Sequence, residues 1–291
     1  MSILADHRTR FVLQGITGRF GRHYGPLMRA YGTQIVAGVT PGRGGESVEG
    51  VPVFDTVAEA VAVRQAEASI VLVPGLAARD AILEAAEAGL RLIVALMDGV
   101  PIQDMLWVKR RLRERDVVLI GPNSPGLITP GQCLAGFIPP HSCMPGPVGI
   151  VSRSGTLTYQ TAHLLKQTGI GQSTAVGIGG DPVVGSTLVD VLTSFETDPD
   201  TKAVVLLGEV GGTMEEDVAA FVREGGFSKP LVAFIAGRLA PPDRPMGHAG
   251  AIVMGRGETY EAKVEALRQA GVAVADLLTQ IPTMIAQRLM T

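Results

Sequence analysis

A histidine between two glycines stands near the C-terminal end of the chain. His248 lies in the stretch R-P-M-G-H-A-G-A-I at 244–252, after an apolar run at 231–236 and a Pro-rich turn at 239–243. Gly247 and Gly250 give this loop freedom to move and leave room for a reactant. The chain has only five histidines. The local pattern fits both an exposed surface imidazole and a nucleophile, so the choice depends on the rest of the chain.

A carboxylate at the end of another apolar run could orient that imidazole. Glu209 follows the run 203–207, inside G-E-V-G-G at 208–212. A carboxylate that accepts the N–H of one ring nitrogen fixes the tautomer and leaves the other nitrogen nucleophilic. The alternative for Glu209 is a surface acid at a turn. We predict that Glu209 and His248 form a catalytic pair.

A glycine turn between the first strand and the first helix is suited to bind phosphate. It has the spacing G-x-x-G-x-x-G at 15–21, which departs from the dinucleotide pattern G-x-G-x-x-G. Backbone N–H groups and the positive end of the helix dipole would face the ligand. The end of the second strand, 39–45, holds Arg43 and no acid to bind ribose hydroxyls. Coenzyme A is therefore the favoured ligand; NADP and a purely structural turn remain alternatives.

A second turn, S-R-S-G-T at 152–156, opens a helix after an apolar run. Two hydroxyls and a glycine at a helix N-terminus could hold a phosphoryl group, or Ser154 or Thr156 could simply cap the helix. The spacing is not G-x-S-x-G, which disfavours a hydrolase nucleophile. The turns at 121–126 and 177–182 also follow strands, where open α/β sheets bind ligands.

These turns must be positioned by alternating strands and helices. Short β-branched runs alternate with longer helical patterns, which predicts an α/β fold with two mainly parallel sheets in series. A Pro-rich linker at 139–147 separates the two series, and we expect domains at 1–140 and 141–291. The expected strands are 11–14, 34–39, 69–73, 90–96, 117–120, 148–151, 172–178, 203–207 and 231–236. The expected helices are 23–30, 56–66, 78–88, 104–113 (with Met105, Leu106 and Trp107 as its core), 157–167, 187–196, 214–224, 260–270 and 278–289.

Composition narrows the class of protein. A chain of 291 residues with 46% hydrophobic side chains can form two globular domains, and a net charge of −3 disfavours nucleic acid as a partner. The N-terminus has no signal pattern, and no apolar run reaches the roughly 18 residues that cross a membrane. Cys133 and Cys143 form no C-x-x-C, and we expect neither a disulfide framework nor a metal site. A cytoplasmic protein is the simplest expectation.

Several motifs, taken together, resemble the α subunit of the succinyl-CoA synthetase (succinate–CoA ligase) family, which includes malate–CoA ligase relatives. They are V-T-P-G-R-G-G at 39–45, G-P-N-S-P-G at 121–126, G-I-V-S-R-S-G-T-L-T-Y at 149–159, G-I-G-G-D-P at 177–182, G-E-V-G-G at 208–212 and M-G-H-A-G-A-I at 246–252. The resemblance runs from about residue 2 to the end. It implies a Rossmann-like CoA-binding domain at 1–140 and a flavodoxin-like domain at 141–291 that carries the active-site histidine.

The resemblance implies a ligase of the tricarboxylic acid cycle in which His248 carries a phosphoryl group. ATP or GTP, held with Mg²⁺ by an ATP-grasp β subunit in an αβ or α2β2 assembly, phosphorylates His248, which passes the group to a small dicarboxylic acid before CoA takes the acyl group. The residues implied to bind CoA are Thr17, Gly18, Arg19, Phe20, Arg43, Val73, Pro74, Leu96, Met97 and Asp98. Those implied to lie near the acid and phosphate are Asn123, Ser124, Ser154, Gly155, Thr156 and Tyr159.

The departures from the family pattern fall in the N-terminal domain. They are Arg19-Phe20 for a small or polar pair, Arg43 for Lys, Pro74-Gly75-Leu76-Ala77 for Pro-Ala-Pro-Phe, Met97-Asp98 for Thr-Glu and Ser124 for Cys. We interpret them as a retuned CoA and acid pocket, in which Phe20 stacks on the adenine. Malate or another short dicarboxylate is therefore an alternative to succinate. The alternatives from other classes are a non-catalytic CoA-binding regulator and an NADP-dependent oxidoreductase.

Overall fold

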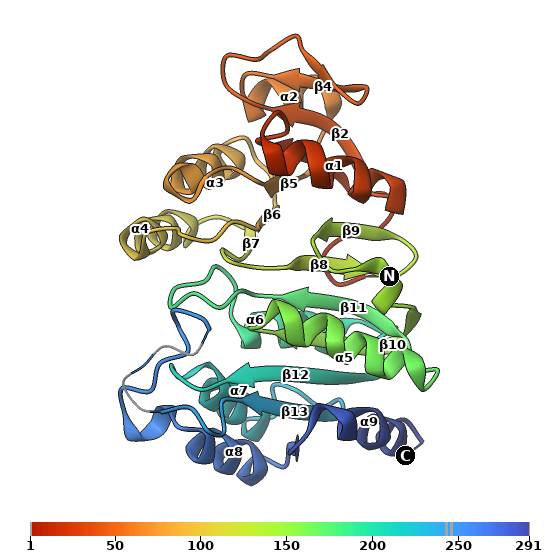
Figure 1. Ribbon diagram of the computed structural model, residues 1–291, viewed down its shortest axis with the longest axis vertical. Coiled ribbons are helices and arrows are strands. Elements are labelled where there is room, and N and C mark those ends of the chain that lie inside the picture. The colour runs from red at the N-terminus through yellow and green to blue at the C-terminus, as the bar shows by residue number, and fades with distance from the viewer. Residues whose placement is uncertain (1, 242–243, 245–246, 291) are drawn as a thin grey trace.

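Two seven-stranded α/β sheets form the protein, one above the other in Figure 1. The computed structural model describes residues 2–241, 244 and 247–290. Pro242 and Asp243 of the Pro-rich turn, Pro245 and Met246 before His248, and both terminal residues lie outside the described residues. In the described part, no helix combines the length and the apolar character that a membrane crossing needs.

The first sheet has the strand order of a Rossmann fold. In spatial order its strands are β3 (Ser47–Val48), β4 (Val51–Phe54), β2 (Gln34–Val39), β1 (Arg10–Gln14), β5 (Ala68–Val71), β6 (Leu92–Ala95) and β7 (Val118–Ile120). All neighbours are parallel except β3, which is antiparallel to β4. The order reverses between β1 and β5, and such a switch point is where this fold binds ligands.

The second sheet has the flavodoxin order, extended by a hairpin. Its strands are β14 (Ala273–Ala275), β13 (Leu231–Ala236), β12 (Ala203–Glu209), β10 (Pro145–Ser152), β11 (Gln172–Gly177), β8 (Gly126–Thr129) and β9 (Cys133–Gly136). β8 is antiparallel to β11, and β9 is antiparallel to β8. The switch point lies between β10 and β12. The predicted fold class, two α/β domains of these two types, is confirmed.

Helices cover the sheets because successive strand residues face opposite sides. Phe11 and Leu13 of β1 join one core cluster, and Val12 joins another. The helices around the first sheet are α1 (Arg19–Tyr31), α2 (Val57–Arg64), α3 (Ala78–Glu87) and α4 (Ile102–Leu112). Those around the second are α5 (Gly155–Gln167), α6 (Leu188–Thr197), α7 (Met214–Arg223), α8 (Tyr260–Gln269) and α9 (Ile281–Leu289). Short 3₁₀ turns lie at Gly75–Ala77, Pro140–Ser142, Arg256–Glu258 and Leu278–Gln280.

Two expectations about elements need correction. The Pro-rich segment 139–147 is not only a linker: β10 already begins at Pro145, and β8 and β9, which precede residue 140, belong to the second sheet. The division at 140/141 stays a prediction, since sheet membership and chain order differ there. Of the three residues expected in the core of α4, Met105 is buried, whereas Leu106 and Trp107 are 55% and 47% exposed, because one side of this helix faces solvent. Trp107 lies beside the Arg79 and Arg111 guanidiniums.

The first glycine turn is shaped by close backbone approach. Gly15 has φ +82°, and a Cβ there would lie 2.5 Å from the Leu72 carbonyl oxygen. A Cβ at Gly21, in α1, would lie 2.3 Å from the Gly15 carbonyl oxygen. The spacing G-x-x-G-x-x-G therefore lets β1, β5 and the start of α1 meet closely. The N-terminus of α1 points to the edge of the sheet where β1 and β5 end.

Candidate functional site

A cleft of about 750 Å³ lies between the two domains, at the carboxyl ends of the strands. This volume is within the ordinary range for sites of small molecules and cofactors. The cleft is lined by Gly18, Arg19, Phe20, Leu72, Val73, Pro74, Gly75, Leu96, Met97, Asp98, Asn123, Ser124, Pro125, Phe137, Gly155, Thr156, Tyr159 and His248. Most of the side chains expected from the sequence to bind CoA, acid or phosphate are therefore brought together.

The N-terminal domain contributes the ends of three elements to this cleft. Gly18, Arg19 and Phe20 come from the start of α1, and the segments after β5 and β6 contribute Val73–Gly75 and Leu96–Asp98. Phe20 is 59% exposed and stacks on Tyr24 at a ring separation of 6.3 Å. Its free face makes it available to a flat ligand group.

The second domain contributes the N-terminus of α5. Gly155 and Thr156 begin this helix and line the cleft, and Tyr159 lies one turn further along. The Ser154 side chain caps the helix, since its hydroxyl accepts the Leu157 N–H at 3.4 Å. The first turn of a helix leaves backbone N–H groups unpaired and carries a partial positive charge, so this end of the cleft favours an anion.

His248 and Glu209 meet at the switch point of the second sheet. Glu209 is the last residue of β12, and its Oε2 lies 2.7 Å from Nδ1 of His248. The side chains of His248 and Glu209 are 25% and 7% exposed. The hydrogen bond to Glu209, opposed by burial, raises the pKa of His248 above its usual value. Because Nδ1 faces Glu209, Nε2 is the ring nitrogen left for chemistry in the cleft.

The ring is seated against Gly180. A Cβ at this position would lie 2.4 Å from Cγ of His248, so a larger residue would displace the imidazole. Gly180 also accepts the Gly250 N–H at 3.1 Å, which ties the histidine loop to the turn after β11. Gly180 of the G-I-G-G-D-P motif thus positions the His248 ring through its backbone and its lack of a side chain.

Asp181 in the same turn was not singled out from the sequence. Its Oδ1 accepts a hydrogen bond from Asn123 Nδ2 at 2.9 Å, and burial raises the pKa of its carboxyl. Asn123 has φ +50° and follows the first sheet, so this contact joins the two domains beside His248. An acid after an apolar strand was the available signal, but nothing in the chain order showed that it faces Asn123.

Three predicted residues do not line the cleft, and a fourth lines it but uses its hydroxyl in bonds to the backbone. Thr17 donates to the Thr40 hydroxyl at 3.1 Å, Arg43 is exposed and pairs with Glu46, and Ser154 serves as the helix cap. Ser124 lines the cleft, but its hydroxyl bonds to the Gly177 carbonyl oxygen and accepts the Gly126 N–H. Their roles in ligand binding stay predictions.

Charged residues behind Glu209 are a second group that sequence reasoning missed. Arg153, Glu215 and Lys263 are almost fully buried and form a chain of ion pairs that ends at Glu209. They come from a turn and from two helices far apart in the sequence. Arg153 lies between two serines and Glu215 lies in the acidic run 215–217, so no local pattern marks them as buried.

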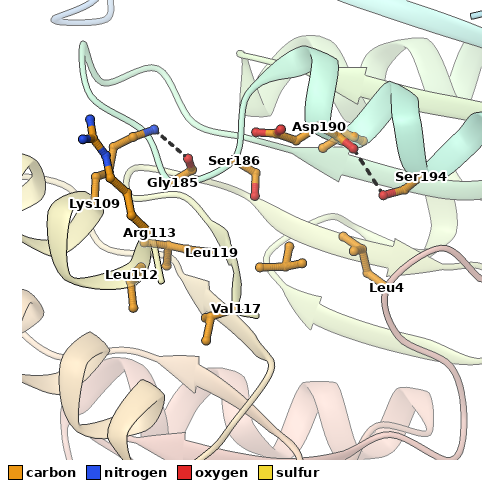
Figure 2. A pocket seen from close by; sticks show the side chains of 12 residues that line it. Leu4, Lys109, Leu112, Arg113, Val117, Leu119, Gly185, Ser186, Asp190 and Ser194 are labelled. Carbon is orange, nitrogen blue, oxygen red and sulfur yellow. Dashed lines mark hydrogen bonds between the residues drawn. The ribbon is translucent and has the colours of Figure 1, made fainter. Parts of the chain in front are cut away.

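A smaller cleft of about 300 Å³ lies between α4 and α6 (Figure 2). Lys109 extends from α4 of the N-terminal domain to the segment before α6 of the second domain. Its Nζ donates to the Val184 and Gly185 carbonyl oxygens at 2.8 and 2.9 Å. Burial lowers the pKa of Lys109. Because its ammonium is used in these bonds, Lys109 braces the two domains.

Two family models match the chain in the same order as the two sheets. The CoA binding domain matches residues 6–99, and the CoA-ligase model matches residues 151–273. The first match covers the glycine turn and the strand ends of the N-terminal domain, and the second covers Glu209 and His248.

Full-length relatives extend this likeness. The chain is 54% identical over 281 residues to succinate–CoA ligase [ADP-forming] subunit alpha 1 of Archaeoglobus fulgidus, covering 97% of this chain and 96% of the relative. It is 50% identical over 289 residues to the alpha subunit of the same ligase from Aquifex aeolicus, covering 99% and 94%. It is also 50% identical over 279 residues to malate–CoA ligase subunit alpha of Methylorubrum extorquens, covering 94% of each chain.

A solved structure has the same fold. ATP citrate lyase of Methanosaeta concilii, a D541A mutant in complex with (3S)-citryl-CoA, superposes with a TM-score of 0.88 at 25% identity. The match covers 98% of this chain and 50% of that chain, so this protein spans half the length of the lyase. The near-complete matches at about half identity, with the two domain models in order, place this chain in the succinate–CoA ligase α-subunit family.

Proposed function

We propose that this chain is the α subunit of a nucleoside-diphosphate-forming acid–CoA ligase that works through a phosphohistidine at His248. The observation that carries the proposal is the 2.7 Å contact between His248 Nδ1 and Glu209, with the ring at the edge of a cleft shared by both domains. A non-catalytic CoA-binding protein has no use for an imidazole held in this way, and an NADP-dependent oxidoreductase gives the His248 loop no role.

The proposed chemistry follows from the two ring nitrogens. Glu209 accepts a hydrogen bond from Nδ1–H, which leaves the lone pair of Nε2 free. Nε2 attacks the terminal phosphorus of the nucleotide, and the nucleoside diphosphate leaves. The negative charge on Glu209 stabilises the positive charge that develops on the ring. The N-terminus of α5, at Gly155 and Thr156, offers N–H groups and a dipole to the phosphoryl oxygens.

The phosphoryl group then moves to a carboxylate. A carboxylate oxygen of the acid attacks the phosphorus, and the P–N bond breaks. His248 leaves as the neutral imidazole, whose Nδ1–H again donates a hydrogen bond to Glu209. CoA supplies the thiolate that attacks the acyl phosphate and releases phosphate. Asn123, Tyr159 and the α5 N-terminus border the place where the acid would lie between the strand ends and His248.

The residues at the other end of the cleft fit CoA. Gly18–Phe20 present a helix N-terminus and an aromatic face, and Val73–Gly75, Leu96 and Met97 form an apolar wall, with the acid Asp98 beside it. A Cβ at Gly75 would lie 2.6 Å from the Asp98 carbonyl oxygen, which keeps this wall closely packed. We propose that the adenine stacks on Phe20 and that the pantetheine arm leads toward His248.

The acid and the nucleotide are chosen by different subunits. Relatives at 54% and 50% identity are named for succinate and malate, so we propose a short dicarboxylate, with succinate favoured and malate the alternative. The alpha-subunit names imply a β subunit, and we propose that this β subunit binds ATP or GTP with Mg²⁺ in an αβ or α2β2 complex in the cytoplasm.

The test is CoA-thioester formation by the co-expressed complex. Succinate, malate, citrate and acetate would each be supplied with CoA, Mg²⁺ and ATP or GTP, and the thioester and nucleoside diphosphate measured together. We expect equal amounts of both products with one dicarboxylate and none with His248→Asn. Thioester formation that persists in His248→Asn would refute the phosphohistidine route.

A further inference from the structure

A chain of buried ion pairs lies behind the catalytic carboxylate. Arg153 is 2% exposed, and Glu215 and Lys263 are 0% exposed. Arg153 follows β10, Glu215 is in the first turn of α7, and Lys263 is in α8. Charged side chains are almost never buried to this degree without a specific set of partners.

Arg153 contacts both segments that carry the catalytic pair. Its Nη2 lies 3.3 Å from Glu209 Oε1, the carboxylate oxygen that does not face His248. Its Nη1 donates to the Glu209 and Gly211 carbonyl oxygens at 3.2 and 2.9 Å. Its Nη2 donates to the Gly250 carbonyl oxygen at 3.3 Å, two residues after His248. One guanidinium therefore spans the end of β12 and the histidine loop.

Glu215 and Lys263 hold Arg153 from the other side. Glu215 Oε1 accepts from Arg153 Nη1 at 3.2 Å and from the Glu209 N–H at 3.1 Å. Lys263 Nζ donates to Glu215 Oε2 at 2.6 Å, to Glu216 Oε2 at 2.9 Å and to the Gly212 carbonyl oxygen at 2.8 Å. A Cβ at Gly208 would lie 2.6 Å from Glu215 Oε1, so the glycine leaves this carboxylate room.

The cluster is poorly explained as a stabilising device. Replacing a buried ion network by apolar residues of similar size is often neutral or stabilising. Within the described part of the chain, Arg153 Nε and Glu209 Oε1 also make no hydrogen bond, which costs free energy at a buried site. The carboxylates of Glu209, Glu215 and Glu216 exceed the cations of Arg153 and Lys263 by one charge, and a protonated His248 would complete the balance.

We propose that Arg153, held by Glu215 and Lys263, is a positioning residue that fixes the Glu209 carboxylate against Nδ1 of His248 and thereby keeps Nε2 directed into the cleft. This inference rests on the proposed phosphohistidine function. The groups that face His248 are Glu209 from the end of β12, Arg153 from the turn after β10 and Asp181 from the turn after β11. Arg153 opposes protonation of the ring, while Glu209 and Asp181 favour it.

The experiment compares phosphohistidine formation across pH in the co-expressed complex. Arg153→Met removes the guanidinium, and Glu215→Gln keeps the shape of its partner but removes the charge. We expect each to slow phosphorylation about 10- to 100-fold. We also expect the acid limb of the Arg153→Met profile to move to higher pH by about one unit, because the guanidinium opposes protonation of the His248 ring and its removal lets the ring take up a proton more readily. Arg153→Lys should return part of the rate.

A matched core variant separates positioning from stability. Phe195→Leu alters a fully buried side chain on α6 of the same domain. Phe195 has no proposed role at His248 or Glu209. This variant should lower stability and leave the pH profile unchanged. If Arg153→Met and Glu215→Gln behave like Phe195→Leu, the positioning role is wrong while the phosphohistidine stands. If Arg153→Met does not fold, Glu215→Gln alone decides in the same way. If the unaltered complex forms no phosphohistidine, the proposed function itself fails.

Discussion

At the His248 ring, one contact of 2.7 Å decides which nitrogen can act. The Glu209 carboxylate accepts from Nδ1, so a proton stays there and Nε2 is left as the proposed nucleophile. The same contact, as its largest cause, raises the pKa of His248. The orientation of the His248 ring and its tendency to take up a proton therefore depend on the same carboxylate.

Glu209→Gln keeps the size of the side chain and removes its charge. We expect phosphorylation of His248 to slow by about 10²- to 10⁴-fold, since the developing imidazolium loses its counter-charge. The pKa of His248 should fall, because the largest cause that raises it is gone. Quenched-flow phosphorylation and an NMR titration of the histidine ring measure the two effects. An unchanged pKa would contradict this account of the ring.

The pH dependence of stability has a definite sign. The pKa of His248 is raised above its usual value of 6.5, so the pair with Glu209 stabilises the folded state fully below about pH 6.5. That contribution is lost as pH rises through the higher folded pKa. Denaturant unfolding of the original chain and of Glu209→Gln across this window should show a difference that shrinks with rising pH. A difference that grows with pH would have the wrong sign.

Phe20 is the residue on which the adenine is proposed to stack. Phe20→Ala should weaken CoA binding about 10-fold, since stacking of a base on an aromatic ring is worth roughly 1–3 kcal/mol. Leu27→Ala is the control, because Leu27 is 52% exposed on the same helix and does not line the cleft. Calorimetric titration with CoA measures both. Equal affinity for Phe20→Ala and the original chain would rule out the stacking.

Among the elements, α4 connects the domains through one lysine. Lys109 bonds to the Val184 and Gly185 carbonyl oxygens in the segment between β11 and α6, and Figure 2 shows the bond to Gly185. Lys109→Met should lower the free energy of unfolding by about 1–3 kcal/mol, because two half-buried acceptors lose their donor. The exposed neighbour Arg110→Met should change it by less than about 0.5 kcal/mol. Urea unfolding compares them, and equal values would contradict a bracing role.

The elements that the sequence predicted well are those with a clear period. β-branched runs such as Leu231–Ala236 and the helix Met214–Arg223 were expected at almost their observed bounds. The hairpin of β8 and β9 was missed, because Gly126–Thr129 and Cys133–Gly136 are short and follow a Gly-Pro turn. β8 is a strand because it pairs with β11, which is encoded far along the chain, and β9 pairs with β8.

The candidate site was predictable where it follows strand ends. Parallel strands end at one edge of a sheet, so turns such as Gly121–Gly126 and the residue Glu209 could be expected near a ligand. The buried partners were not predictable in this way. Arg153 and Glu215 meet because the folded chain brings the turn after β10 to the first turn of α7, so their contact depends on tertiary structure rather than local spacing.

In the whole molecule, the two domains share a core cluster and together line the cleft at His248. A single cluster of buried side chains runs from Leu13 and Met28 of the N-terminal domain to Leu127 and Val176 of the second sheet. The cleft that holds His248 therefore has walls from both domains. In the proposed function, this arrangement lets CoA, bound on one domain, approach a phosphoryl group carried by the other.

The intact mass of this chain shows whether His248 carries a phosphoryl group. The chain would be co-expressed with its β subunit, treated with ATP or GTP and Mg²⁺, and compared with His248→Asn. We expect an acid-labile gain of about 80 Da, one phosphoryl group, that is absent from the variant and is discharged by the dicarboxylate substrate together with CoA. A gain that persists in His248→Asn, or no gain in a complex that forms the thioester, would contradict it.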